Sequence, residues 1–300
     1  MLSILIPTYN YNVYPLAFQL EQQALDANIV FEIICFDDGS TNAKTIKENE
    51  KINTLENSSF IALDVNIGRS KIRNSLASKA NFEWLLFLDA DTMPVSNLFI
   101  SNYLSALHKQ SKIIYGGILY KQKTPPNNQV LRWIYGKNRE ALSKTLRNKN
   151  PYLRFLTLSF LIHKNVFKKV AFNEDIPNLR HEDTLFALDL KREMINIAHI
   201  DNPVYHLGLE TNKQFLQKSL QSVKAISIFV NQGLMPYNAT LITKIHHYTN
   251  KIHLNHVLKH LYLNKKIREY FESQLLSREP SLFLFDLYRL SYFCSLKKQE

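Results

Sequence analysis

Short apolar runs alternate with helix-like segments along the first part of the chain. Strands are predicted at residues 2–6, 31–36, 60–63 and 84–88, and helices at residues 13–25, 42–55 and 69–79. Buried strands that alternate with helices over short links are typical of a parallel sheet covered on both faces. The pattern therefore predicts an α/β fold with a mostly parallel sheet flanked by helices.

The pattern is less regular beyond residue 91. Helices are predicted at residues 96–109, 165–170 and 181–192, and strands at residues 113–120, 155–163 and 195–200. The polar and basic segment 121–154 is predicted to be a mobile loop with one helical patch. From residue 212 onward the apolar positions follow a helical period, interrupted at residues 233–236, which predicts a C-terminal helical extension.

Composition narrows the class of protein. The 300 residues are 45% hydrophobic and 21% charged, which is typical of a globular chain with a sizeable core. No apolar run reaches the roughly 20 residues that span a membrane, and the start has no basic leader, so we expect neither a spanning helix nor a signal peptide. Two cysteines, Cys35 and Cys294, indicate no disulfide framework and favour a reducing, cytoplasmic setting.

The net charge of +11 is concentrated near the C-terminus. Residues 1–210 contain 24 Lys/Arg and 21 Asp/Glu, whereas residues 211–300 contain 13 and 5. Nucleic acid, anionic lipid and an acidic ligand are all compatible with such a basic segment, but no nucleic-acid recognition motif is present, so nucleic acid is not expected. Within it, His253, His256 and His260 fall at helical spacing, and we interpret them as a solvated face rather than a metal site.

Two predicted strands end in paired carboxylates. Residues 84–88 lead into Asp89-Ala90-Asp91, and residues 31–36 lead into Asp37-Asp38. Carboxylates beside a core are costly to desolvate, and ligands usually bind at the carboxyl edge of an open α/β sheet. An acidic pair with a one-residue spacer suits a divalent cation. Taken alone, the pair also fits a polar loop in which Asp91 caps the next helix.

Five features in register along the chain resemble glycosyltransferase family 2, the inverting enzymes of the A-type glycosyltransferase fold. They are Pro7-Thr8-Tyr9-Asn10, Asp37-Asp38-Gly39-Ser40, Asn66-Ile67-Gly68 followed by Arg73-Asn74, Asp89-Ala90-Asp91, and His181-Glu182-Asp183. The resemblance covers residues 1–208. It implies a nucleotide-binding sheet in a catalytic domain at 1–210, with a nucleotide-sugar half at 1–95, an acceptor half at 96–210 and a basic helical extension at 211–300.

The resemblance implies a donor site with a divalent metal, Mn²⁺ or Mg²⁺, which bridges the diphosphate as a Lewis acid. Asp91 is the expected direct ligand, and Asp89 contacts the metal or the ribose. His206 is either a further metal ligand, as in several relatives, or a structural histidine at a strand end. Arg73 either reaches the donor or is an exposed helix charge. The donor-binding residues implied are Pro7, Thr8, Tyr9, Asp37, Asp38, Gly68, Arg73, Asp89 and Ala90.

Asp183 matches the catalytic base of the family. A carboxylate there accepts the proton of the acceptor hydroxyl as the new glycosidic bond forms. Glu182 is expected to orient the acceptor, and His181 to line the pocket that holds it. Without the other motifs, Glu182 and Asp183 would be read as acids favoured by the positive end of a helix dipole.

These residues predict transfer of a sugar from a nucleotide-sugar, a UDP-sugar, to a hydroxyl of a glycan or lipid-linked acceptor, as in polysaccharide or cell-envelope synthesis. The Gln-x-x-Arg-Trp motif of processive synthases is absent, because Arg132-Trp133 lacks the glutamine and precedes Asp183, so one sugar per encounter is expected. The competing interpretations are a sugar nucleotidyltransferase and a non-catalytic nucleotide-sugar-binding module.

The C-terminal segment has a second interpretation. Between Lys265 and Leu290, aromatic and aliphatic residues are interleaved with lysines and arginines. This mixture is typical either of a helical cap or of peripheral contact with a membrane interface. The expected location is cytoplasmic, at the inner face of the cell membrane in the second case.

Overall fold

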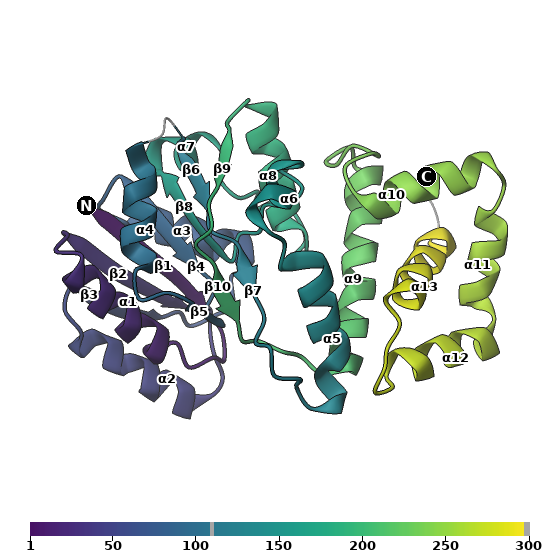
Figure 1. The fold of residues 1–300 in the computed structure, drawn as a ribbon, viewed down its shortest axis with the longest axis horizontal. Helices are drawn as coiled ribbons and strands as arrows, with labels where there is room; N and C mark the ends of the chain where they lie inside the picture. The colour runs from purple at the N-terminus through teal and green to yellow at the C-terminus, as the bar shows by residue number, and fades with distance from the viewer. Residues whose placement is uncertain (109–110, 297–300) are drawn as a thin grey trace. The chain divides into compact units, whose positions relative to one another are not determined.

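The computed structural model describes residues 1–108 and 111–296, and the chain divides into two compact units (Figure 1). The first unit comprises Met1–Tyr120, Ala141–Asn178 and Glu182–Gly208. The second unit comprises Lys121–Glu140, Leu179–His181 and Leu209–Glu300. The assignment of a catalytic function to residues 1–210 and of an extension to residues 211–300 stays a prediction.

A seven-stranded sheet in the order β3-β2-β1-β4-β8-β6-β9 forms the centre of the first unit. Strands β3, β2, β1 and β4 are mutually parallel, β8 is antiparallel to β4 and β6, and β9 is parallel to β6. The predicted mostly parallel α/β sheet is confirmed. The strands are β1 (Leu2–Thr8), β2 (Phe31–Asp37), β3 (Ser58–Ala62), β4 (Trp84–Leu88), β6 (Ile113–Tyr115), β8 (Ser159–His163) and β9 (Ile197–His199).

Helices cover both faces of this sheet (Figure 1). On one face, α3 (Arg69–Lys79), α7 (Lys164–Lys169) and α8 (Glu182–Arg192) enclose a phenylalanine-rich core. Its rings stack closely, and Phe172 lies 4.4 Å from Phe186 between ring centroids. The elements that cover the other face or flank the sheet are α1 (Tyr14–Asp26), α2 (Ala43–Glu50), η1 (Lys51–Thr54), α4 (Phe99–Ser105) and η2 (Ala106–His108).

A small three-stranded sheet of β5 (Thr92–Pro94), β10 (Val204–His206) and β7 (Ile118–Leu119) was not anticipated. The predicted strand 113–120 is wrong, because the chain leaves the large sheet at Gly116-Gly117 and enters the small one. Gly117 has a φ of +96°, which favours glycine. A Cβ on Gly116 would lie 2.1 Å from the carbonyl oxygen of Asn202, so the close passage of two backbones requires glycine there.

The prediction of a single helical patch at residues 121–154 is also wrong, whereas the predicted mobility of this loop stays a prediction. The segment contains η3 (Asn127–Gln129), α5 (Val130–Tyr135), η4 (Gly136–Glu140) and α6 (Lys144–Asn148). Arg147 is buried, and its guanidinium donates to the carbonyl oxygens of Tyr115, Gly116 and Ile200. Arg147, a charged residue in a polar run, therefore satisfies backbone carbonyl groups where β6 and β9 end. The predicted end of the helix at residues 96–109 lies outside the described residues.

The second unit is helical, which confirms the predicted C-terminal helices. A core of Leu131, Phe215, Leu216, Phe271, Leu275, Phe285 and Tyr288 holds it together. Among the described residues no helix is both long enough and apolar enough to cross a membrane. Besides α5, its helices are α9 (Asn212–Asn231), α10 (Leu241–Lys251), α11 (Asn255–Leu263), α12 (Lys265–Leu275) and α13 (Leu282–Ser295).

Candidate active site

The acidic residues that follow β2 and β4 lie at one edge of the large sheet. Strands β2, β1 and β4 are parallel neighbours, so their carboxyl ends point the same way. After β4 the chain turns sharply, because the Asp89 carbonyl oxygen accepts both the backbone N–H and the hydroxyl of Thr92. That turn directs the chain into β5 and places Asp91 at the sheet edge.

Asp38 holds the glycine turn that precedes α3. Its two carboxylate oxygens accept the backbone N–H groups of Ile67 at 2.7 Å and Gly68 at 3.1 Å. Gly68 has a φ of +89°, which a side chain would strain. Asp38 therefore shapes the start of α3, while its predicted contact with the donor stays a prediction.

Asp37 has one oxygen occupied and one unsatisfied. Oδ1 accepts the backbone N–H of Ser40 at 2.8 Å, whereas Oδ2 is buried without a hydrogen-bond partner among the described residues. A buried acceptor without a partner is costly, so a ligand N–H or O–H is a suitable partner for Oδ2.

The loops after β1 and β2 are tied together. Asn10 donates its backbone N–H to Ser40 Oγ at 2.6 Å, and its Oδ1 accepts backbone N–H groups of the loop after Ser40. Thr8 is buried and donates its hydroxyl to the Tyr11 carbonyl oxygen. Pro7 and Ala90 are half-buried and Tyr9 is exposed, so the Tyr9 ring is accessible for stacking on a base.

Arg73 links the acidic turn to α8. This buried guanidinium donates to Asp89 Oδ1 at 2.6 Å, and its NH1 lies 3.6 Å from Glu182 Oε1. Burial opposes the charged form, but the attraction of Asp89 and Glu182 outweighs it and raises the pKa of Arg73. The alternative of an exposed helix charge is therefore wrong. For Asp89, burial raises the pKa, and Arg73 offsets part of that rise.

His206 lies beside Asp91 because two short strands pair. In the antiparallel register of β5 and β10, His206 is opposite Thr92, and Leu207 donates its backbone N–H to the Asp91 carbonyl oxygen at 2.8 Å. His206 Nε2 lies 3.3 Å from Asp91 Oδ2, while its Nδ1 is buried without a hydrogen-bond partner among the described residues. A carboxylate and an imidazole this close are a donor set that suits a manganese-like ion.

The predicted metal ligands do not form one cluster. No group of three or more His, Cys, Asp or Glu side chains that could hold a metal occurs in the part of the chain that the structure describes. Asp89 pairs with Arg73 instead, which leaves Asp91 and His206 together. Two protein ligands fit a metal whose other positions are filled by the diphosphate of a substrate.

Tyr11, whose carbonyl oxygen accepts the Thr8 hydroxyl, is a further candidate residue that the sequence analysis did not name. Burial and, to a lesser extent, the negative charge of Asp91 raise its pKa, so its phenol lies in the field of the same carboxylate. The available signal was a second tyrosine in the loop after the first strand, two positions beyond Tyr9. Only the folded loop brings it to Asp91.

Glu182 and Asp183 begin α8 and have different surroundings. Glu182 Oε1 lies within ion-pair distance of Arg73 and Arg69. Asp183 Oδ1 accepts the backbone N–H of Thr184 at 2.7 Å. Burial raises the pKa of Asp183, and the bonds from Thr184 and the charge of Arg73 offset part of this rise. Successive helix residues point about 100° apart, which explains why one carboxylate pairs with arginines and the other does not.

His181 belongs to the second unit, although it precedes Glu182 in the chain. Its φ is +75°, and its Nε2 lies 2.7 Å from Ser222 Oγ in α9. Its predicted role in the acceptor pocket stays a prediction.

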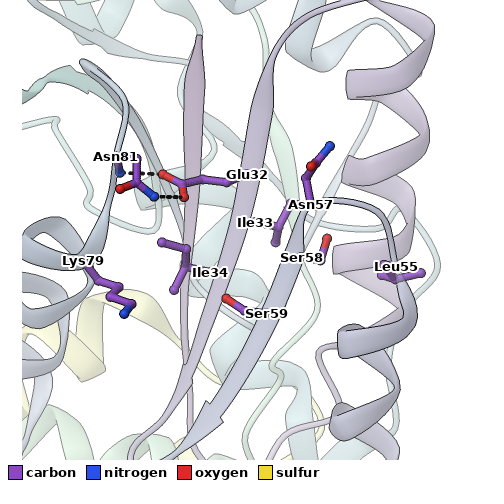
Figure 2. Close-up of a pocket in the computed structure, with 9 residues that line it drawn as sticks. All are labelled: Glu32, Ile33, Ile34, Leu55, Asn57, Ser58, Ser59, Lys79 and Asn81. Atoms are coloured by element: carbon purple, nitrogen blue, oxygen red, sulfur yellow. Dashed lines mark hydrogen bonds between the residues drawn. The ribbon is translucent and has the colours of Figure 1, made fainter.

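A pocket of about 320 Å³ opens at the opposite edge of the sheet, where β2 and β3 begin (Figure 2). Its carboxylate, Glu32, already accepts the backbone N–H and the side-chain amide of Asn81 at 2.6 and 2.7 Å. That charge is satisfied within the protein, and the other polar groups that line the pocket are the Lys79 ammonium, the Asn57 amide and the hydroxyls of Ser58 and Ser59. It is lined by Glu32, Ile33, Ile34, Leu55, Asn57, Ser58, Ser59, Lys79 and Asn81.

Replacing Gly208 with alanine is expected to abolish the response to manganese. A Cβ at this position would lie 1.9 Å from Asp91 Oδ2, so the carboxylate has to leave its place beside His206. Thermal unfolding with UDP, with and without Mn²⁺, measures the response. Gly233→Ala is the control for loss of a glycine: its φ of +71° strains alanine and lowers Tm, but no atom lies within 4 Å of a Cβ there, so the shift caused by Mn²⁺ should be that of the wild type. A wild-type manganese response in Gly208→Ala would contradict the prediction.

Comparisons with known proteins identify the fold and the family. A curated protein of Haemophilus influenzae, described as an uncharacterized glycosyltransferase, is 26% identical over 260 residues, which is 79% of this chain and 96% of that protein. The mannosyltransferase PcManGT of Pyrobaculum calidifontis, solved with GDP-Man and Mn²⁺, has a TM-score of 0.56 at 12% identity over 100% of this chain and 88% of its own. For S. aureus TarS with UDP-GlcNAc the TM-score is 0.50 at 18% identity, over 92% and 79%.

These structural neighbours share the A-type glycosyltransferase fold with this chain. The profile described as Glycosyl transferase family 2 matches residues 3–174, a range that includes the acids after β2 and β4 but ends before Asp183 and His206. Because this match covers more than half of the sequence, the chain belongs to glycosyl transferase family 2.

Proposed function

We propose that the chain is an inverting, metal-dependent glycosyltransferase that moves a sugar from a UDP-sugar to a hydroxyl of a glycan or lipid-linked acceptor. One observation carries the proposal. In the first unit, Arg73 joins the acidic turn after β4 to the start of α8, where Asp183 lies. The acidic turn, which is suited to binding a metal and a diphosphate, is thereby linked to the helix start that carries Asp183, which is suited to accepting a proton.

The nucleoside part of the donor binds at the ends of β1 and β2. Asp37 Oδ2 accepts a base N–H, which supplies the partner that this buried oxygen lacks within the described residues. The exposed Tyr9 ring stacks on the base. Asp89, oriented by Arg73, accepts a ribose hydroxyl.

Asp91 and His206 would hold the metal, and Tyr11 lies in the field of the same carboxylate. When bound, a divalent ion supplies Lewis-acid stabilisation of the departing diphosphate. Gly208 keeps the space that the Asp91 side chain needs.

Asp183 removes the proton of the acceptor hydroxyl. The acceptor oxygen bonds to the anomeric carbon, the bond from that carbon to the phosphate oxygen breaks, and the proton moves to the Asp183 carboxylate. The base and the leaving group act on opposite sides of the sugar, so the configuration inverts. A pKa raised by burial makes this carboxylate a better proton acceptor than an ordinary aspartate.

Manganese and a UDP-sugar together are expected to stabilise the protein and to yield UDP by slow hydrolysis, in which water takes the place of the acceptor hydroxyl and receives the sugar. A ligand at about 100 times its Kd stabilises the native state by about 2.7 kcal/mol, which a thermal shift detects. Asp91→Ala is expected to lower the rate of UDP release by about 100-fold or more, because several kcal/mol of charge stabilisation are lost. Asp26→Ala, an exposed aspartate at the end of α1, is the matched control.

The outcomes separate the alternatives. A non-catalytic binding module would be stabilised without releasing UDP, and a nucleotidyltransferase would act on a nucleoside triphosphate and release pyrophosphate. Stabilisation by GDP-mannose but not by UDP-sugars would reject a UDP-sugar as the donor and indicate a GDP-sugar instead. Full activity in Asp91→Ala or after chelation by EDTA would reject the metal.

A further inference from the structure

An exposed apolar stripe runs along α10 in the second unit. Its members are Leu241, Ile245 and Tyr248 on the helix and Ile252 at its C-cap, with 63%, 39%, 66% and 64% of their surface exposed. The spacing of four, three and four residues confines them to an arc of about 60° on the helix. Single exposed apolar residues need no explanation, but an aligned set on one helix face marks an interaction surface.

Positive charge flanks the stripe. Lys244 and Lys251 are exposed and fall together on the neighbouring face of α10. The sequence from residue 211 to residue 268 contains no aspartate or glutamate. An apolar stripe beside lysines, in a segment without acids from residue 211 to residue 268, is complementary to a surface that is apolar inside and negatively charged outside.

Residues 265–290, which also mix apolar and basic side chains, pack most of their large apolar residues into or against one core. Between Lys265 and Leu290, the large side chains Phe271, Leu275, Phe285 and Tyr288 are buried in the core of the second unit. These residues serve packing, so the helical cap is the better description of α12 and α13. Tyr270 on α12 and Phe283 on α13 are exposed singly, whereas the aligned set of exposed apolar residues lies on α10.

We propose that α10 docks onto an anionic lipid surface, lying in the plane of the interface with its apolar stripe in the acyl boundary. Interfacial helices bury such a face about 5–10 Å deep and place lysines against lipid headgroups. Tyr248 suits this position, because tyrosine is enriched where an apolar layer meets water. The proposal goes beyond the proposed reaction and does not depend on it.

A second copy of the chain is a poorer occupant. An isologous contact through α10 brings the same basic flank against itself, and no acid in residues 211–268 compensates for it. Nucleic acid would match the lysines but leave the stripe in water. Anionic lipid satisfies both features.

Flotation of the full chain with vesicles tests the proposal. We expect binding to vesicles of phosphatidylglycerol and phosphatidylcholine in equal parts, and weak binding to phosphatidylcholine alone. The double variant Lys244→Gln, Lys251→Gln is expected to lower the partition coefficient about fivefold for each lysine, and added salt to weaken binding by the wild type. Ile245→Ser with Tyr248→Ser is expected to lower it at least tenfold.

Phe283→Ser is the matched control, because Phe283 is 74% exposed on α13, outside the stripe, and its loss should leave binding unchanged. Circular dichroism verifies folding, and the lysine variant keeps the proposal testable if the serine variant unfolds. No binding by the wild type, or wild-type binding by both double variants, overturns the proposal. So does a dimer in light scattering that Ile245→Ser with Tyr248→Ser converts to a monomer.

Discussion

Replacing Asp183 with asparagine is expected to lower kcat by about 10²–10⁴-fold, the usual contribution of a positioned general base. Asparagine has the same shape, and its Oδ1 still accepts the Thr184 backbone N–H, so the start of α8 is preserved. The proton acceptor alone is lost. Donor affinity, measured by calorimetry with UDP and Mn²⁺, should be unchanged, because the donor residues lie on other elements.

The pH dependence of kcat provides a second readout of Asp183. The base acts as a carboxylate, so the rate falls as pH drops through its pKa. Burial raises that pKa, so the acidic limb lies at a higher pH than for an ordinary aspartate. The limb should be absent from the residual activity of Asp183→Asn.

Asp189→Asn is the control for the same helix. Asp189 is also an aspartate of α8, but its Oδ1 pairs with Arg192 at 2.9 Å on an exposed surface. This variant should keep wild-type turnover. Near-normal transfer by Asp183→Asn would contradict its assignment as the base.

Replacing Arg73 with glutamine is expected to have the largest effect on stability. The change leaves Asp89 and Glu182 without their buried cation, and breaking a buried pair on one side costs about 3–5 kcal/mol. Asp89 keeps a third of its side-chain surface exposed, so we expect a loss of about 3 kcal/mol. Such a loss lowers Tm by roughly 6–12 °C, which calorimetry measures directly.

Arg192→Gln is the matched control for charge removal. Its side chain is 68% exposed and pairs with Asp189 on the surface of α8, where such a pair contributes at most about 0.5 kcal/mol. Equal Tm values for Arg73→Gln and the wild type would show that Arg73 is not a supporting charge.

The effects of Arg73→Gln and Asp183→Asn are related, because the charge of Arg73 acts on the Asp183 carboxylate. Arg73 stabilises the ionised form of Asp183 and lowers its pKa. Its removal should therefore move the acidic limb of kcat to higher pH, whereas Arg192→Gln should leave the limb in place. A limb that stays at the wild-type pH in Arg73→Gln would separate Arg73 from the catalytic base.

Local patterns predicted the regular part of the fold well. The strand at residues 84–88 and the helix at residues 69–79 have the predicted bounds, because long apolar runs and helical periods are local signals. Strands β5 and β10 escaped prediction, since three residues are too few to show a period. The polar segment around Arg147 was wrongly predicted to have one helical patch, because the carbonyl groups that accept hydrogen bonds from the buried guanidinium are distant in the sequence.

For the candidate site, too, local sequence patterns predicted one part and the folded structure decided the other. The sequence by itself determined most of the candidate residues and that the acids at the carboxyl ends of β2 and β4 meet, because parallel strands expose these ends at one edge. Only the tertiary structure decided how they are used. Asp89 pairs with Arg73, Asp91 with His206, and Tyr11 lies in the field of Asp91, because partners separated by up to 115 positions are set by packing and register rather than by local pattern.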